Sequence, residues 1–157
     1  LFSATFLGLM QAAYAYTLDY LTGGADGAPA KKTVGPVMGN SIADMMVKIE
    51  AARALYLRSV SEAKLPPTHE IRQRSRAAHV MVQRTVAEVA QEAIRVCGGR
   101  ALLKEFPLER FLRDAQTMIN NMLYLSERGR MELGRNPDDS VIVEGHVRVP
   151  PVVFVGQ

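Results

Sequence analysis

The sequence contains few cysteine, histidine and aromatic residues. The shortage of cysteine and histidine argues against disulfides, catalytic thiols and metal sites. Its one cysteine, Cys97, cannot form a disulfide within the chain, so we expect a reducing compartment such as the cytoplasm. A catalytic thiol needs a basic neighbour that stabilises the thiolate. Cys97 instead directly precedes two glycines, where a cysteine is typically a small buried hydrophobic residue. We therefore predict a structural role for Cys97.

Metal-binding patterns are absent from the sequence. The three histidines, His69, His79 and His146, lie far apart and have no ligand spacing. Helical bundles that bind two metal ions carry Glu-x-x-His pairs on inward-facing helix positions, and no such pair occurs here. We expect no metal site.

An excess of charge of one sign is also missing. The chain has 19 Lys and Arg against 16 Asp and Glu, a formal net charge of +3. Arg72, Arg74 and Arg76 occupy alternate positions, so on a helix they fan around the axis and do not form one stripe. We expect a solvated surface of mixed charge and no nucleic-acid partner. Binding of nucleic acid or a membrane surface through these arginines is an alternative that their spacing disfavours.

The chain opens on an apolar run, residues 1–21, for which three interpretations compete. A signal peptide has a basic segment before its apolar stretch, and none precedes Leu1. A membrane span needs about 20 apolar residues, but polar residues such as Gln11 and Asp19 interrupt this run. The third interpretation is a buried helix of a longer protein that begins upstream of Leu1. We favour this last interpretation and expect no membrane span.

The next segment with helical periodicity covers residues 37–64, and Pro66-Pro67 is expected to end it. Its predicted inner face consists of Ile42, Met45, Met46, Ile49, Ala52, Leu55 and Tyr56.

A third helix is predicted from Thr68, which has the side chain of an N-cap, to Cys97. Gly98 and Gly99 are expected to end it in left-handed geometry. Its apolar stripe consists of Ala78, Met81, Val82, Val86, Val89, Ala90, Ala93 and Ile94.

A fourth helix is predicted from Pro107, a favoured first helical residue, to between Gly129 and Gly134. Glu109 and Arg113 are spaced to pair along its outer side, as are Arg110 and Asp114. Its inner face consists of Leu108, Phe111, Leu112, Ala115, Ile119, Met122 and Leu123.

Four amphipathic helices joined by short connections predict an all-α fold, an antiparallel four-helix up-and-down bundle over residues 1–135. Residues 136–157 have a different composition, in which valines alternate with polar residues as in a half-buried strand. We expect this segment to be an extended valine-rich C-terminal tail that packs on the bundle or on a partner. A poorly ordered terminus is the alternative.

The stretch GGRALLKEFPLERFLRDAQ, residues 98–116, resembles the C-terminal helical domain of the acyl-CoA dehydrogenase superfamily. The matching features are the glycine pair, the start of the last helix at Pro107 and the Arg113-Asp114-Ala115 segment. Upstream, ADMMVKIEAAR at 43–53 resembles the second bundle helix of that family. The opening helix, with GLMQA at 8–12, resembles the first. The resemblance therefore covers residues 1–134.

This resemblance implies an FAD bound between the bundle, a middle β-domain and a neighbouring subunit. It implies that Gly98 and Gly99 let the main chain approach the adenine-diphosphate end of the flavin, because glycine has no Cβ. Arg95 stands where the family usually has glutamine, and an arginine there can meet the pyrophosphate charge. Ala101 replaces a third family glycine. The family arginine that follows the first helix has no aligned counterpart, and Lys31 and Lys32 are unaligned substitutes.

The resemblance identifies no catalytic residue. The family's usual catalytic glutamate follows the Arg-Asp-Ala segment by seven residues, and that position here is Met122, which cannot accept a proton. A minority arrangement puts the glutamate on the first bundle helix, which by alignment falls upstream of Leu1. Related flavin monooxygenases use a histidine in the last helix, where this chain has Asn120 and Asn121.

Two functions remain open. In the first, the chain is the C-terminal domain of an FAD-dependent oxidoreductase that dehydrogenates an acyl thioester, and it supplies part of the flavin site and of a homo-oligomer interface. The intact protein is then an enzyme with an acyl-CoA-type substrate, although the isolated chain is not expected to catalyse the reaction by itself. In the second, the chain is a catalytically inactive association module of the same superfamily, as Met122 suggests.

Overall fold

The computed structural model describes residues 2–25, 28, 33–117 and 119–120. Three long helices come first: α1 (Phe2–Thr22), α2 (Pro36–Ser61) and α3 (His69–Cys97). A short 3-10 helix, η1 (Gly99–Leu102), follows. Residues 107–117 and 119–120 are also helical, and the part of the chain that is described contains no strand. The all-α class is thus confirmed, whereas the up-and-down order stays a prediction.

The helix ends follow local sequence signals. Gly23, at a φ of +79°, comes directly after α1. The backbone N–H of Ile71 donates to Oγ1 of Thr68 over 3.3 Å, which confirms Thr68 as the N-cap of α3. The helical segment that starts at residue 107 carries the predicted ion pair between Glu109 and Arg113, whose closest N···O distance is 3.0 Å.

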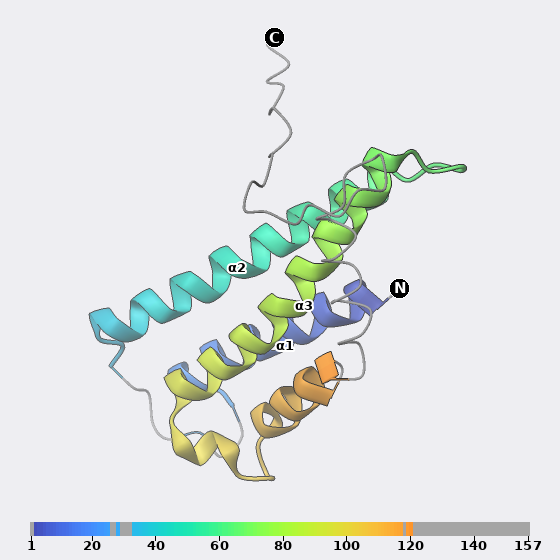
Figure 1. Cartoon of the computed structure of the whole chain (residues 1–157). Coiled ribbons are helices and arrows are strands. Elements are labelled where there is room, and N and C mark those ends of the chain that lie inside the picture. The colour runs from blue at the N-terminus through green and yellow to red at the C-terminus, as the bar shows by residue number, and fades with distance from the viewer. Residues whose placement is uncertain (1, 26–27, 29–32, 118, 121–157) are drawn as a thin grey trace, which may run out of the picture.

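The helix α3 lies at the centre of the fold and packs along both α1 and α2, as Figure 1 shows. Most of its predicted apolar stripe is buried, and Cys97 is buried with it, as predicted. Leu108 and Ala115 of the last helical segment are fully buried in the same core. The core therefore receives side chains from every helix that is described.

The opening helix is buried along one face. Its most deeply buried side chains recur at spacings of three and four residues and are Phe6, Met10, Ala13, Thr17 and Tyr20. Thr17 satisfies its hydroxyl by donating to the carbonyl of Ala13 over 2.8 Å. No helix in the described ranges is long and apolar enough to cross a membrane. These observations confirm α1 as a partly buried helix of the bundle.

The predicted inner face of α2 is partly wrong. Met45, Ile49 and Ala52 are buried, but Met46 is 54% exposed and Leu55 is 39% exposed. Successive residues on a helix differ by about 100° in direction, so Met46 and Leu55 lie well round from the buried line. Because α2 packs against the bundle on one side only, these two side chains stay outside it.

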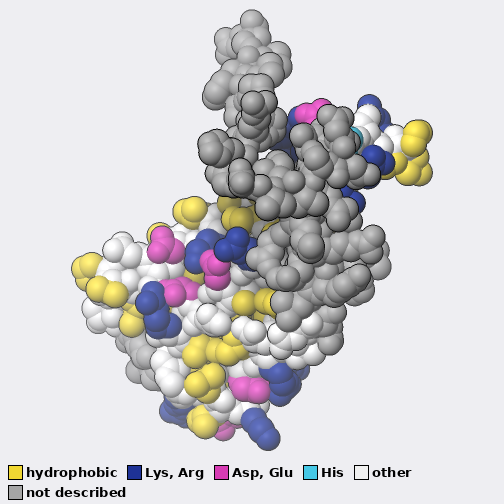
Figure 2. Space-filling model, in the orientation of Figure 1, with side chains coloured by type: hydrophobic (Ala, Val, Ile, Leu, Met, Phe, Trp, Pro, Cys, Tyr) yellow, Lys and Arg dark blue, Asp and Glu magenta, His cyan; other side chains and the backbone are white. Residues whose placement is uncertain are grey.

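The surface mixes charges of both signs. On the face that Figure 2 shows, described Lys and Arg side chains lie beside Asp and Glu rather than in one basic patch. One such pair, Lys48 with Glu88, links α2 to α3 with a distance of 2.8 Å between the ammonium nitrogen and the carboxylate oxygen. Exposed pairs of this kind contribute little to stability.

The valine-rich tail predicted for residues 136–157 lies outside the described residues, as do Met122, Asn121, Lys31 and Lys32. The predicted boundary between bundle and tail at residue 135 also lies there and stays a prediction.

Candidate functional site

The glycine pair forms a sharp turn at the end of α3. Gly98 has φ +94° and ψ 171°, a combination that is open almost only to glycine. This differs from the left-handed helical geometry expected from the sequence, in which ψ is near +50°. The turn is held by hydrogen bonds from the N–H of Gly98 to Ile94 O (2.8 Å) and from the N–H of Ala101 to Gly98 O (2.9 Å).

The main chain of this turn is open to approach. A Cβ built on Gly98 or on Gly99 meets no heavy atom within 4 Å, so no described side chain covers either residue closely. Ala101, where the family usually has another glycine, is by contrast fully buried. Of these three positions, therefore, the glycine pair is the one that leaves backbone accessible to a ligand.

The segment after the turn is anchored by aromatic contacts. Phe106 is buried and meets the ring of Tyr20, on α1, edge to face with 6.3 Å between the ring centroids. The guanidinium carbon of Arg100 lies 5.6 Å from the centroid of the Phe106 ring, within cation–π range. These contacts hold the glycine turn against the end of α1.

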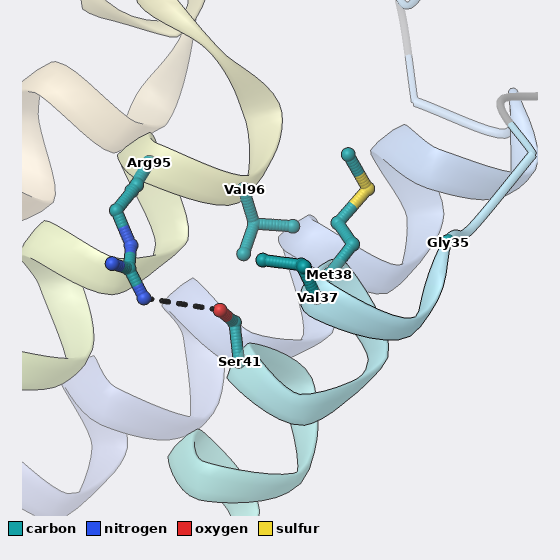
Figure 3. A pocket seen from close by; sticks show the side chains of 6 residues that line it. All are labelled: Gly35, Val37, Met38, Ser41, Arg95 and Val96. Carbon is teal, nitrogen blue, oxygen red and sulfur yellow. Dashed lines mark hydrogen bonds between the residues drawn. The ribbon is translucent and has the colours of Figure 1, made fainter.

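Arg95 lies one turn before the glycines and bridges α3 to α2. Its NH2 group donates to Oγ of Ser41 over 3.1 Å, across 54 residues of sequence (Figure 3). Its Nε donates to Oε1 of Glu92 over 3.1 Å, and NH2 also contacts that oxygen. The Arg95 side chain is nevertheless 70% exposed. A guanidinium fixed at one edge in this way is preorganised for a further acceptor.

Glu92 is the carboxylate that holds this arrangement. Its side chain is only 19% exposed. Burial on its own would raise the pKa of Glu92, but hydrogen bonds from Arg95 and Ser41 outweigh burial and lower it below the ordinary value. The positive charges of Arg95 and Lys48 act in the same direction. Glu92 is therefore ionised at neutral pH and keeps Arg95 and Ser41 together.

A pocket of about 280 Å³ opens between the start of α2 and the end of α3. Figure 3 shows the residues that line it, which are Gly35, Val37, Met38, Ser41, Arg95 and Val96. Its walls are mainly apolar, with Arg95 and Ser41 as the polar groups at one side. Gly35 is the N-cap of α2, and no side chain donates or accepts a capping hydrogen bond there. The first turn of α2 contributes Val37 and Met38 to the pocket lining, so the N-terminal end of this helix lies beside the pocket.

Of the three site residues predicted from the sequence, Arg95 lines this pocket, whereas Gly98 and Gly99 do not. The glycines follow Val96 closely and form the adjoining turn. Sequence reasoning missed Ser41, Val37 and Met38. Glu92 could have been found from its i,i+3 spacing to Arg95.

A catalytic group is not evident among these residues. Asn120, one of the two residues that replace the monooxygenase histidine, is exposed in the last helical segment. Within the ranges that the structure describes, no three His, Cys, Asp or Glu side chains gather as metal ligands do. What the arrangement offers is an apolar pocket, one oriented cation and open backbone, which suits binding rather than bond breaking.

Comparison with known proteins decides the family. Residues 1–122 match the family model described as "Acyl-CoA dehydrogenase, C-terminal domain". The chain belongs to this family. The expected resemblance is thus confirmed over the three long helices, the glycine turn and the described part of the last helical segment.

Similar proteins include the probable acyl-CoA dehydrogenase FadE25 of Mycobacterium tuberculosis, 30% identical over 117 residues. That match covers 69% of this chain and 26% of the relative. The mitochondrial short-chain specific acyl-CoA dehydrogenase of Mus musculus is 31% identical over 113 residues, which cover 70% of this chain and 26% of the relative. The chain thus spans about a quarter of the length of these relatives.

A solved structure has the same fold. It is described as the electron transferring flavoprotein of Acidaminococcus fermentans, and the matched chain superposes with a TM-score of 0.69 at 22% identity. The match covers 83% of this chain and 33% of the other. At 22% identity this match shows that the two chains share an arrangement of helices, and it is evidence for the fold alone.

Proposed function

We propose that this chain is the C-terminal domain of an FAD-dependent, acyl-CoA dehydrogenase-like oxidoreductase and that it forms one wall of the flavin site. Family membership supports a flavoenzyme-related role. The observation that carries the proposal is the open glycine turn beside the Arg95 pocket, because a nucleotide needs both accessible backbone and an oriented cation.

The residues present fit the adenine-diphosphate part of FAD. Val37, Met38 and Val96 offer an apolar surface of the kind that buries a flat ring. Arg95 adds a cation, and the first turn of α2 adds the positive end of a helix dipole. The positive charge of Arg95 and the positive end of the α2 dipole both favour binding of a negatively charged diphosphate. Gly98 and Gly99 leave room for main chain to approach it.

When bound, FAD would supply the hydride acceptor for the β-carbon of an acyl thioester, and a carboxylate would have to remove the α-proton. The residues described here would bind the adenine-diphosphate part of FAD and orient it. Glu92 fixes Arg95, and Arg95 faces the pocket from α3. We propose that the carboxylate comes from another part of the intact protein, since Met122 cannot serve. The acyl-CoA substrate, a homo-oligomeric state and a cytoplasmic location belong to the same proposal.

The test is the flavin content of the native polypeptide, measured on a sample of known mass, together with two matched variants. Gly99→Ala places a methyl group where the nucleotide is expected to approach, and we expect it to weaken FAD binding at least tenfold. Gly8→Ala is the control, because a Cβ at Gly8 on α1 also meets nothing within 4 Å. Native protein that is colourless and takes up no added FAD would refute the proposal.

The second candidate is an inactive association module of the same family, which the methionine at position 122 favours. This candidate predicts oligomers that lack flavin and show no turnover of any acyl-CoA with an electron acceptor. Steady turnover by a preparation free of contaminants would eliminate it.

A further inference from the structure

Arg95, Glu92 and Ser41 form a closed hydrogen-bonded group, which we call the Arg95 triad. Arg95 donates from Nε to Oε1 of Glu92 and from NH2 to Oγ of Ser41, each over 3.1 Å. The hydroxyl of Ser41 in turn donates to the carboxylate of Glu92. Because Ser41 belongs to α2 and the other two residues to α3, the triad connects the two helices at one edge of the pocket (Figure 3).

The triad leaves part of the guanidinium available to a ligand. Glu92 and Ser41 engage Nε and NH2, whereas NH1 makes no hydrogen bond within the described part of the chain. Ser41 is only 6% exposed, and the side chain of Glu92 is much less exposed than that of Arg95. An anion that reaches the triad therefore meets the two N–H donors of NH1 first.

The charges of the triad cancel. Arg95 carries one positive charge at neutral pH and Glu92 carries one negative charge. Among the described residues that line the pocket, Arg95 is the one that is charged. A diphosphate at this edge thus meets N–H donors together with a carboxylate that repels it. Even at the dielectric constant of water, two unit charges about 5 Å apart change a dissociation constant by roughly fourfold.

Ser41 has a different effect, because it is neutral. Its hydroxyl accepts from Arg95 and donates to Glu92, so removing the hydroxyl leaves both charges in place and removes the contact that fixes Arg95 to α2. A long side chain that is already held in place loses less conformational entropy when it binds a ligand. The hydroxyl of Ser41 therefore favours binding, whereas the charge of Glu92 opposes it.

We infer that Glu92 limits how tightly this pocket binds a diphosphate, by cancelling the charge of Arg95, and that Ser41 positions Arg95 with NH1 free to donate. The inference rests on the proposed function, since the diphosphate is that of the proposed FAD, and it assigns the affinity to three residues of this chain. Removing the carboxylate charge is expected to strengthen binding, although Glu92 is a hydrogen-bonding partner of Arg95.

The test is a charge cycle on the intact native polypeptide, freed of any flavin and titrated calorimetrically with FAD, ADP and inorganic pyrophosphate. Glu92→Gln keeps an acceptor for Arg95 and removes the negative charge, so we expect binding at least about fourfold tighter at low salt. Arg95→Gln keeps N–H donors and leaves the carboxylate unbalanced, so we expect binding at least about fourfold weaker. The double variant R95Q/E92Q is neutral again and should return to within about twofold of the original dissociation constant.

Salt separates charge from positioning in the same titrations. The gain from Glu92→Gln should shrink at about 0.5 M salt, because salt screens exposed charges. Ser41→Ala is expected to weaken binding about threefold at both salt concentrations, since it changes no charge. The matched control is Glu88→Gln, which removes a carboxylate one turn earlier on α3, outside the pocket lining, and should change the dissociation constant less than twofold. Circular dichroism checks that each variant is folded.

The outcomes distinguish this inference from the flavin proposal. FAD binding that is unchanged or weaker in Glu92→Gln, or a double variant as weak as Arg95→Gln, overturns the inference and leaves the flavin proposal standing. Pyrophosphate binding in the expected order by a protein that takes up neither FAD nor ADP supports the inference and removes the flavin proposal. A protein that binds none of the three ligands refutes both.

Discussion

The ring of Phe106 packs edge-on against the ring of Tyr20, with an angle of 89° between the ring planes. The two residues belong to segments at opposite ends of the described chain, yet Tyr20 is 1% exposed and Phe106 is 4% exposed. This contact connects the loop after the glycine turn to the first helix. The position of Gly98 and Gly99 relative to the bundle therefore depends on an aromatic pair that does not line the Arg95 pocket.

The first prediction concerns this pair. Phe106→Ala removes a buried ring and leaves a cavity against Tyr20, so we expect it to lower the free energy of unfolding by about 3 kcal/mol. Leu103→Ala, in the same loop but at a residue that is 50% exposed, is the control and should change it by less than about 0.5 kcal/mol. Urea denaturation followed by circular dichroism measures both. A loss below about 1 kcal/mol for Phe106→Ala would mean that the ring contact does not hold the loop.

The second prediction separates the two glycines. Gly98 has a positive φ that side chains rarely adopt, so Gly98→Ala is expected to cost about 1–3 kcal/mol of stability although there is space for the methyl group. Gly99 has ordinary backbone geometry and equal space, so Gly99→Ala should leave the free energy of unfolding within about 0.5 kcal/mol. Thermal and urea denaturation of the two variants, measured side by side, check this. Equal effects would contradict the turn geometry.

The third prediction concerns pH. The pKa of Glu92 is lowered in the folded chain, so the stability that Glu92 contributes is present above its ordinary value of 4.5 and is lost as the pH falls through the folded value. Glu92→Gln is therefore expected to cost about 1–2 kcal/mol at pH 7, and this cost should disappear in acid. Urea denaturation at a series of pH values measures it.

The matched control is Glu88→Gln, which breaks an exposed ion pair with Lys48 and should cost less than about 0.5 kcal/mol at pH 7. A cost for Glu92→Gln that is the same at pH 7 and in acid would show that the carboxylate charge does not hold Arg95 and Ser41.

Local sequence signals predicted the helices closely. Thr68, the prolines at 66 and 67 and the glycine pair act within a few residues, because capping hydrogen bonds and backbone sterics are local interactions. The same reasoning placed Arg95 and the glycines near one end of α3, and Arg95 is in fact a pocket residue. Their proposed contact with FAD stays a prediction.

The face of α2 could not be predicted in the same way. Apolar residues occur on both sides of this helix, so periodicity alone assigned Met46 and Leu55 to the core together with Met45 and Ile49. Which line of residues is buried depends on where α3 and α1 lie.

The sequence by itself determined that the chain is helical, where its described helices begin to within one residue, and to which family it belongs, because propensity, capping and motif spacing are properties of neighbouring residues. The end of α2 was predicted less well, since this helix stops at Ser61 rather than at residue 64. Only the tertiary structure decided that Arg95 meets Ser41 across 54 residues and that Glu92 holds both. It also decided which side of α2 stays exposed. These features depend on how α2 docks on α3, and docking is set by the summed burial of side chains from distant helices rather than by any single stretch of sequence.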